Sequence, residues 1–531
     1  MMSGTGHLET LILSSTIHFD DIRDQSLLEF KYLKSLDLSC SRIQNLSDDI
    51  CALKELRYLN LSCTLIERLP DSITRLSRLE TLDLSWCYRL KELPKQMHNL
   101  THLQHLDLLL CESLSSLPSK IGLLRSLNLM PLFVLGKDDD CARLGELKWL
   151  NQLRGRLEIR NLENARGLRE AKDAKLDRKN LYHLGLSWIR NSDKCSKILK
   201  YLRPNEQLKV LELTGYMGTK FPNWMPCMSS LTKISINDCG CKELPSLGAL
   251  KFLVELQLRD MMNIKSIGPE FYGYRSADVF LSLEQLGLYD IPRLWRWSLP
   301  KVFGRRSVFR SLKTLTIEGC PQLEGLPSLP SLPNLIIWNS NSEILDLLTS
   351  FRSLASLLIK EMEFSPLQME YVSRLNSLKK LILYNLKDFT FLPNFEEFRT
   401  LEHLEELVIE GCPLLLFLGS HGSPTPRSLR KLIINRCPTL HISKDHFKML
   451  EKLEYLFINE CPRLEMELEM EHSLISHVHC VISGNHKLEQ AMTSRKVLRV
   501  SSPAESDRSL LTDPEGAKAE KMESDNVADE A

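Results

Sequence analysis

The stretch Leu33-x-x-Leu36-x-Leu38-x-Cys40 decides the fold, because its spacing of leucines followed by a cysteine returns three more times. The copies are Leu56-x-x-Leu59-x-Leu61-x-Cys63, Leu79-x-x-Leu82-x-Leu84-x-x-Cys87 and Leu103-x-x-Leu106-x-Leu108-x-x-Cys111. The middle leucines at positions 36, 59, 82 and 106 lie 23, 23 and 24 residues apart. A fixed period of this length predicts a solenoid of stacked, similar units.

Each unit predicts one short strand and a return segment. Alternation puts Leu36 and Leu38 on one face of the strand, with Ser35 and Asp37 on the other. One unit buries about six apolar side chains at about 1.5–3 kcal/mol each, whereas ordering its backbone costs about 1–2 kcal/mol per residue. Units must therefore stack. We expect an α/β solenoid, a leucine-rich repeat horseshoe with a parallel β-sheet on the concave face and irregular turns and short helices on the convex face.

The totals exclude several classes of function. The 531 residues hold 68 Lys and Arg against 68 Asp and Glu, so no net charge favours nucleic acid. No apolar run approaches 18 residues, and the first residues are polar, so we expect no membrane span and a cytoplasmic or nuclear protein. Most of the 15 cysteines fall at a fixed place in the repeat, which predicts buried thiols.

Four segments are predicted along the chain. Residues 1–128 are regular leucine-rich repeats, and residues 129–180 are an irregular insertion in which the period breaks. The insertion carries a polar loop at Lys137–Asp140 and an amphipathic helix over Asn164–Lys179. Residues 181–485 are irregular repeats, and residues 486–531 are a disordered acidic tail with nine acids against three bases after position 500. The array begins at His7, so we expect a cap or adjoining domain before it.

The irregular repeats have strand centres 20 to 30 residues apart, and four of them end in Cys-Pro, where proline ends the strand. The predicted centres are Leu184, Leu211, Ile234, Leu256, Leu286, Leu315, Leu335, Leu357, Leu381, Leu407, Leu432 and Leu456.

Several phrases together resemble a known family, the leucine-rich repeat region of plant intracellular nucleotide-binding disease resistance proteins of the coiled-coil class. The resemblance covers about residues 8–480. It is carried by Leu56-Arg-Tyr-Leu-Asn-Leu-Ser, Leu153-Arg-Gly-Arg-Leu-Glu-Ile-Arg-Asn-Leu-Glu-Asn-Ala165, Leu184-Gly-Leu-Ser-Trp188, Gly215-Tyr-x-Gly-x-x-Phe-Pro-x-Trp224 and Ile267-Gly-Pro-Glu-Phe-Tyr-Gly273.

The resemblance implies a plant defence role. In that family the repeats contact a nucleotide-binding switch module and contribute to sensing a pathogen effector, or a host protein that the effector alters. This chain has no Gly-x-x-x-x-Gly-Lys-Ser/Thr phosphate loop, since Gly136-Lys137 lacks the earlier glycine and is followed by Asp138. We therefore expect no cofactor here, because ATP or ADP would belong to a nucleotide-binding module that the chain lacks.

The sequence places a protein-binding surface on the concave face and predicts no enzyme. No nucleophile elbow occurs, and Cys239-Gly-Cys241 lacks the spacing of a metal site. The candidate contact residues are the polar and aromatic positions in or beside the strands: Arg57, Tyr58, Asn60, Glu80, Thr81, Asp83, Trp86, Gln104, His105, Asp107, Trp188, Arg430, Lys431, Glu454 and Tyr455.

Two other classes of binding protein stay open. A substrate adaptor of a ubiquitin ligase also uses an irregular solenoid, but it carries a helical docking domain before the repeats. A generic protein-binding scaffold would use the same surface. A cell-surface receptor ectodomain should show a signal peptide and paired-cysteine caps, which this sequence does not show.

Overall fold

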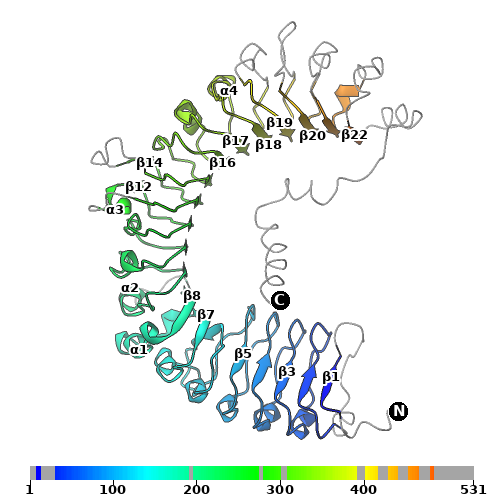
Figure 1. The fold of residues 1–531 in the computed structure, drawn as a ribbon, viewed down its shortest axis with the longest axis vertical. Helices are drawn as coiled ribbons and strands as arrows, with labels where there is room; N and C mark the ends of the chain where they lie inside the picture. The colour runs from blue at the N-terminus through cyan, green and yellow to red at the C-terminus, as the bar shows by residue number, and fades with distance from the viewer. Residues whose placement is uncertain are drawn as a thin grey trace, which may run out of the picture. The chain divides into compact units, whose positions relative to one another are not determined.

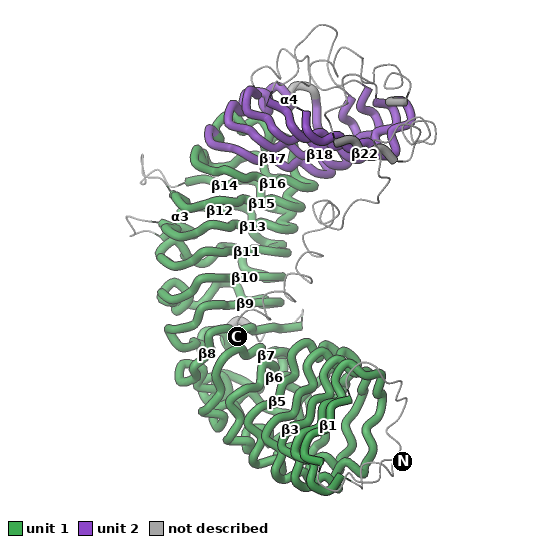
Figure 2. The backbone as a smooth tube through the Cα atoms, turned by 45° about the vertical axis from the view of Figure 1, so that its right-hand side comes forward, with its two compact units in different colours: residues 1–351 green, residues 352–531 purple. Residues whose placement is uncertain are grey.

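The structure is a computed structural model, and it divides into two compact units, residues 1–351 and residues 352–531 (Figure 2). It describes residues 8–13, 30–189, 195–273, 279–299, 308–390, 401–416, 428–440, 453–465 and 479–483. The predicted acidic tail, 486–531, lies outside the described residues. Each unit is a stack of parallel strands.

Unit 1 opens with a five-stranded parallel sheet built from the repeats that the leucine spacing predicted. Its register aligns Leu36, Leu59, Leu82 and Leu106 side by side, and all four are fully buried. The strands are β1 (Thr10–Ile12), β2 (Ser35–Asp37), β3 (Tyr58–Asn60), β4 (Thr81–Asp83) and β5 (His105–Asp107).

Short 3₁₀ helices close these repeats on the side away from the strands (Figure 1). Pro70 comes directly before the 3₁₀ helix Asp71–Arg75 and has φ −67°, a value that its ring fixes and that suits the entry to a helical turn. Ile73, Met97 and Ile121 point inward from three of these helices and are fully buried, so they complete the core behind the leucines. The helices are η2 (Asp48–Ala52), η3 (Asp71–Arg75), η4 (Met97–Asn99) and η5 (Ile121–Leu123).

The predicted irregular insertion contains a further strand and helix. A parallel bridge from His105 to Leu129 leads to β6 (Leu132–Val134), and η6 (Leu144–Trp149) follows on the helical side. All three residues of β6 are buried, so the strand shows no alternation and its sequence gives no period-2 signal. The loop Lys137–Asp140 is exposed between them.

The helix predicted over Asn164–Lys179 is three short pieces instead: η7 (Leu162–Asn164), α1 (Leu168–Asp173) and η8 (Leu176–Arg178). Gly167 has φ +148° and Lys175 has φ +48°, and neither value continues a right-handed helix. Two backbone breaks therefore divide a segment whose apolar spacing alone favours one helix.

The rest of unit 1 is a parallel ladder that bears out the predicted strand centres. Leu184, Leu211, Ile234, Leu256, Leu286, Leu315 and Leu335 all lie in strands and are at most 2% exposed. The strands are β7 (Arg154–Arg160), β8 (Asn180–Ser187), β9 (Val210–Thr214), β10 (Lys233–Asn237), β11 (Glu255–Arg259), β13 (Gln285–Tyr289), β15 (Thr314–Glu318) and β16 (Asn334–Trp338). The helices are α2 (Cys195–Ile198), η9 (Leu199–Tyr201), η10 (Met225–Cys227), α3 (Pro269–Tyr272) and η12 (Ser342–Ser350).

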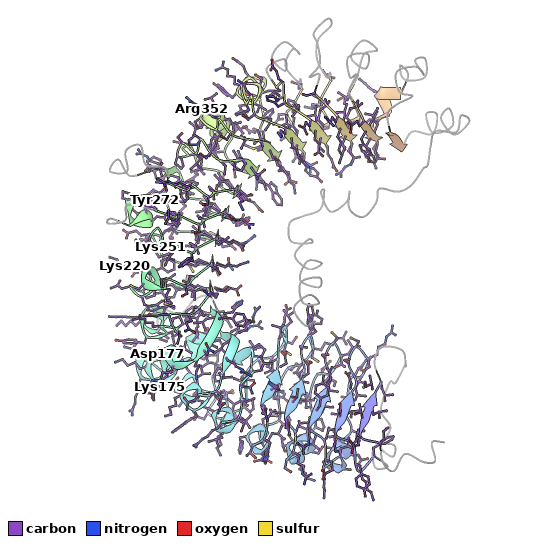
Figure 3. The ribbon with its side chains drawn as sticks, viewed as in Figure 1. Lys175, Asp177, Lys220, Lys251, Tyr272 and Arg352 are labelled. Carbon is purple, nitrogen blue, oxygen red and sulfur yellow. The ribbon has the colours of Figure 1, made fainter. Side chains whose placement is uncertain are left out.

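An aromatic cluster fills the helical side of unit 1 around Tyr272 (Figure 3). There β12 (Ser266–Ile267) pairs with β14 (Arg296–Trp297), and Trp297 Nε1 donates to the Tyr272 hydroxyl at 2.6 Å. Burial raises the pKa of Tyr272. Trp297 is 2% exposed within this cluster, whereas Trp295, two residues earlier, is 45% exposed.

Unit 2 continues the same ladder of buried leucines. Leu357, Leu381, Leu407, Leu432 and Leu456 occupy the second position of their strands and are at most 5% exposed, as the sequence predicted. The elements are β17 (Ser356–Lys360), α4 (Pro366–Ser373), β18 (Lys380–Tyr384), β19 (Glu406–Glu410), β20 (Lys431–Asn435), β21 (Tyr455–Asn459), η13 (Pro462–Glu465) and β22 (His479–Ser483).

Candidate functional site

We call the face of each sheet that points away from the leucine core the open face. In a parallel solenoid its side chains come from the positions between the core leucines, and in-register pairing arranges them in rows across the strands. The predicted contact residues lie in or next to strands β3, β4, β5, β8, β20 and β21. The open face is therefore the candidate functional site.

The central row of the open face in β2 to β5 stabilises the backbone. Asp37, Asn60, Asp83 and Asp107 stand side by side in the register. Each uses its Oδ1 to accept the backbone N–H two residues later, at 2.9 Å in all four cases. Side chains predicted to face a partner thus also hold the turn after each strand.

Because Asn60 makes the same bond as its aspartate neighbours, the charge of this row can be removed without losing the bond. We expect Asp83→Asn with Asp107→Asn to leave the urea midpoint of unfolding unchanged. The alanine pair should lower the unfolding free energy by about 2 kcal/mol, since each lost bond costs about 1 kcal/mol. Burial raises the pKa of Asp107, so a neutral amide is well suited there. Equal losses for the two pairs would contradict this role.

Polar contacts tie the neighbouring predicted residues together across repeats. Arg57 Nη1 lies 2.7 Å from Glu80 Oε1, and Thr81 Oγ1 lies 3.1 Å from His105 Nδ1. Burial, then the charges of Asp37 and Asp83, raise the pKa of Tyr58. Gln104 lies just before β5 and is exposed, and its backbone N–H bonds to the Glu80 carbonyl.

The two predicted tryptophans differ in accessibility. Trp86 follows β4, is 38% exposed and packs edge-on against Tyr88 with the ring centroids 5.9 Å apart. Trp188 follows β8 but is only 4% exposed, with its ring 5.4 Å from that of Tyr216. The expectation that Trp188 lies on the open face is therefore wrong. Its ring turns into the core because Tyr216 of the next repeat provides an aromatic neighbour.

The open face of β7 to β11 carries a charged network that the sequence analysis did not single out. Glu212 Oε2 lies 3.2 Å from His183 Nε2 and 4.0 Å from Arg156 Nη2. Lys233 pairs with Glu255 at 3.0 Å on the next strands. Burial alone would raise the pKa of Glu212, but His183, Arg156 and Lys233 together lower it. Glu212 therefore lies among three basic side chains on this face.

The predicted residues of unit 2 lie on and beside its last described strands. Arg430 and Glu454 form an exposed ion pair at 3.1 Å. Lys431 Nζ lies 3.4 Å from Glu406 Oε1 and 5.4 Å from the centre of the Tyr455 ring. An exposed pair contributes at most about 1 kcal/mol to stability, so these groups can change partners at little cost.

The central row of the open face in unit 2 is apolar, a feature that the sequence analysis missed. The register aligns Leu358, Ile382, Val408, Ile433 and Phe457 on β17 to β21, and we call these five residues the apolar row. The matching row in unit 1 reads Glu212, Ser235, Gln257, Gly287 and Thr316 on β9 to β15, and becomes apolar only at Ile336 on its last strand, β16.

Polar and aromatic side chains flank the apolar row on both sides. On one side Lys380 and Lys431 both reach Glu406, at 3.0 and 3.4 Å. On the other side Asn459 Nδ2 donates to Asn435 Oδ1 at 2.8 Å. Leu358, Ile382 and Ile433 are half-buried, and Val408 and Phe457 are 3% and 8% exposed. The row is a seam of apolar side chains between polar rims.

The structure gives reasons against metal binding at Cys239 and Cys241. The Cys239 thiol donates to Asn237 O at 3.4 Å, and the Cys241 thiol donates to Gly218 O at 2.9 Å. Burial raises the pKa of Cys241 to about 12 and raises that of Cys239 as well. The two thiols point at different carbonyls and do not converge on one ligand position.

A groove of about 1200 Å³ lies on the helical side of unit 1. Its charged lining includes the ion pairs Arg68–Glu92 at 3.1 Å and Lys95–Asp140 at 2.7 Å. Asp138, Asp140 and Cys141 are close together there, but Lys95 already holds one of the two carboxylates. We therefore keep the open face as the candidate site.

Within the described residues, no helix has both the length and the apolar character needed to cross a lipid bilayer.

Family models match two parts of the chain. A model described as "Leucine rich repeat" matches residues 6–63 and 31–88. A model described as "R13L1/DRL21 LRRs" matches residues 144–261, which include residues 144–180 of the predicted insertion 129–180.

Related proteins agree with these matches. The chain is 31% identical over 360 residues to putative disease resistance RPP13-like protein 1 of Arabidopsis thaliana, which covers 62% of this chain and 32% of that protein. It is 32% identical over 281 residues to putative disease resistance protein RGA1 of Solanum bulbocastanum, covering 51% of this chain and 28% of that protein. The chain thus spans about a third or less of the length of these curated relatives.

A solved leucine-rich repeat protein of Leptospira interrogans, LIC12759, is 20% identical with a TM-score of 0.40, over 90% of this chain and 96% of that one. The stacked strands, the leucine ladder and the family models together assign the fold. The fold is a leucine-rich repeat solenoid, and its repeats are similar in sequence to those of plant disease resistance proteins.

Proposed function

We propose that this chain is the recognition region of a plant defence protein. Its open face binds a pathogen effector or a host protein altered by an effector, and it contacts a nucleotide-binding switch module that holds ATP or ADP. The names of the relatives support the defence role. The chain acts as a binding scaffold rather than as an enzyme, in the cytoplasm or the nucleus.

The apolar row is the observation that carries the binding proposal. The core of unit 2 is already formed by the leucines at the core positions. Unit 1 forms the same core with polar residues at positions that match Leu358, Ile382 and Ile433, so the core does not require apolar residues there. Apolar side chains on a solvent-facing surface typically mark a contact site. A partner that covers them gains about 25 cal/mol for each Å² removed from water.

The shape of the row favours a protein over a small molecule. Five strands at about 4.8 Å spacing make a row about 19 Å long, and the pairs Lys380–Glu406 and Arg430–Glu454 extend the polar margin. Protein interfaces combine an apolar centre with a polar rim in this way. Tyr384 and Tyr455 stand at the rims, and tyrosine is enriched where binding energy concentrates.

The test replaces two half-buried residues of the row. We expect Ile382→Glu with Ile433→Glu to reduce binding at least about 30-fold, equal to about 2 kcal/mol, because the partner must then bury two carboxylates. The measurement is proximity-dependent biotin labelling in pathogen-challenged leaf cells, followed by calorimetry with each purified protein whose labelling changes.

The matched control is Gln285→Glu with Thr314→Glu, a pair that is in register on β13 and β15 of unit 1. It should leave labelling unchanged. Ile382→Thr with Ile433→Thr keeps β-branched strand residues and guards against a folding defect. Identical labelling by the natural chain, the control and both row variants would reject the row as the binding surface.

A further inference from the structure

The cysteines of the four opening repeats occupy two different places, although they share one sequence motif. In Leu38-x-Cys40 and Leu61-x-Cys63 the cysteine comes two residues after the last leucine, whereas in Leu84-x-x-Cys87 it comes three residues after. The one-residue difference decides exposure. Cys87 is fully buried with its thiol on the Leu61 carbonyl at 3.1 Å, whereas Cys40 and Cys63 are exposed.

Cys40 and Cys63 are equivalent residues of neighbouring repeats. Strands β2 and β3 are in register up to Asp37 and Asn60, each three residues before its cysteine. The ladder continues beyond the strands, because the Cys40 N–H bonds to Ser62 O at 2.8 Å. Both residues have the left-handed backbone, with φ +54° and +55°. Their Cα–Cβ bonds therefore point the same way.

This geometry brings the two thiols within reach of each other. Neighbouring parallel strands lie about 4.8 Å apart, and disulfides form across Cα separations of about 4.4–6.8 Å. Burial and then the neighbouring Cys40 thiol raise the pKa of Cys63 to about 11. The next two repeats have Trp86 and Leu110 at the equivalent left-handed position, so among these four repeats only Cys40 and Cys63 place a thiol there.

We propose that Cys40 and Cys63 are a modification site at which a peroxide converts two exposed thiols into a disulfide between adjacent repeats. One thiolate attacks a peroxide oxygen, the O–O bond breaks and the leaving hydroxide takes a proton to become water. The second thiolate attacks the sulfenic sulfur, the S–O bond breaks, and the leaving hydroxide takes the second proton to become water. Two electrons pass from the sulfurs to the peroxide.

Other cysteines of the described chain have less favourable surroundings. Cys87 and Cys111 are fully buried, and burial raises the pKa of Cys111 to about 12. Cys227 is exposed but donates to Asn223 O on the helical side of its own repeat. The disulfide would join the two repeats beside the exposed pair Trp86 and Tyr88, at the margin of the open face.

The experiment treats the folded full chain with hydrogen peroxide and maps its peptides without reduction. We expect a linked peptide pair carrying Cys40 and Cys63, lighter by two hydrogens, which dithiothreitol reverses. The rate should rise from pH 7 to pH 9, because attack needs thiolates. The link should be absent from Cys40→Ser and Cys63→Ser, persist in the control Cys227→Ser and fall to the level of random pairing in urea.

Three results would overturn the proposal. The first is a Cys63–Cys87 link in place of the Cys40–Cys63 link. The second is separate oxidation of Cys40 and Cys63 to sulfinic acids in the folded chain without a link. The third is equal cross-linking in folded and urea-unfolded chains, which would show that the repeat geometry plays no part. Folding of both serine variants is checked by circular dichroism, since Ser at an exposed position removes only the thiol.

Discussion

Raising the pH from 8 to 10.5 is expected to stabilise the natural chain relative to a Lys179→Met variant by about 3 kcal/mol, at about 1.4 kcal/mol for each pH unit. Lys179 is 1% exposed, and burial lowers the pKa of its ammonium from an ordinary 10.5 to about 8. Between these two values the folded chain has released a proton that the unfolded chain still holds. Stability therefore rises with pH across this window and levels off above it.

The position of Lys179 explains why a buried amine is kept there. Its Nζ donates to the carbonyls of Leu147 and Leu150 at 2.8 and 2.7 Å, at the C-terminal end of η6. The Leu147 carbonyl also accepts the Leu150 N–H and the Leu150 carbonyl the Leu153 N–H, so the lysine bonds to the second lone pair of each oxygen. A neutral amine still donates to both carbonyls, so deprotonation removes the cost of the buried charge and keeps the bonds.

The measurement compares urea unfolding of the natural chain and of Lys179→Met at each pH. Taking the difference cancels the titration of thiols and tyrosines, which both chains share. The control is Lys175→Met, because Lys175 is an exposed lysine of the same segment on the outer side of unit 1 (Figure 3). The difference in unfolding free energy between Lys175→Met and the natural chain should not change with pH. A flat difference for Lys179→Met would show that the lysine stays charged in the fold.

Leucine spacing predicted the strand ladder because each core leucine meets an equivalent leucine in the next repeat. Leu184 and Leu456, for example, lie at the predicted strand centres in the two units. The insertion was harder to predict, because β6 is buried at all three positions and shows no period. Backbone breaks at Gly167 and Lys175 likewise divided a helix that side-chain spacing favoured.

The candidate site was predicted less well, since sequence alone does not show what covers a side chain. Ile382 and Ile433 lie in apolar runs, Leu381-Ile-Leu383 and Leu432-Ile-Ile434, which are typical of strands buried on both faces. Their open-face role follows only from the register. Trp188 shows the opposite error: it was expected among the contact residues, but its ring is buried.

Replacing Gly215 by alanine is expected to lower the unfolding free energy of unit 1 by about 3 kcal/mol or more, through strain and steric overlap. Gly215 has φ +75°, which side-chain-bearing residues adopt at a cost. A Cβ at this position would lie 2.0 Å from the carbonyl oxygen of Trp188. That oxygen belongs to backbone, so no rotamer change can make room.

The neighbouring repeat holds the Trp188 carbonyl in place. The Trp188 N–H bonds to Thr214 O at 2.9 Å, the Gly215 N–H bonds to Asn237 O at 3.0 Å, and the buried Trp188 ring packs against Tyr216. Moving the carbonyl would therefore disturb two ladder bonds and an aromatic contact together. The burial of Trp188 and the glycine at position 215 are two parts of one packing arrangement.

Urea unfolding followed by circular dichroism measures the effect, with Gly145→Ala as the control. A Cβ at Gly145 would meet its nearest neighbour at 3.8 Å, an ordinary contact, and η6 surrounds it with helical backbone. Alanine there should leave stability unchanged or raise it by up to about 1 kcal/mol. A loss below about 1 kcal/mol for Gly215→Ala would mean that the repeats shift apart at little cost.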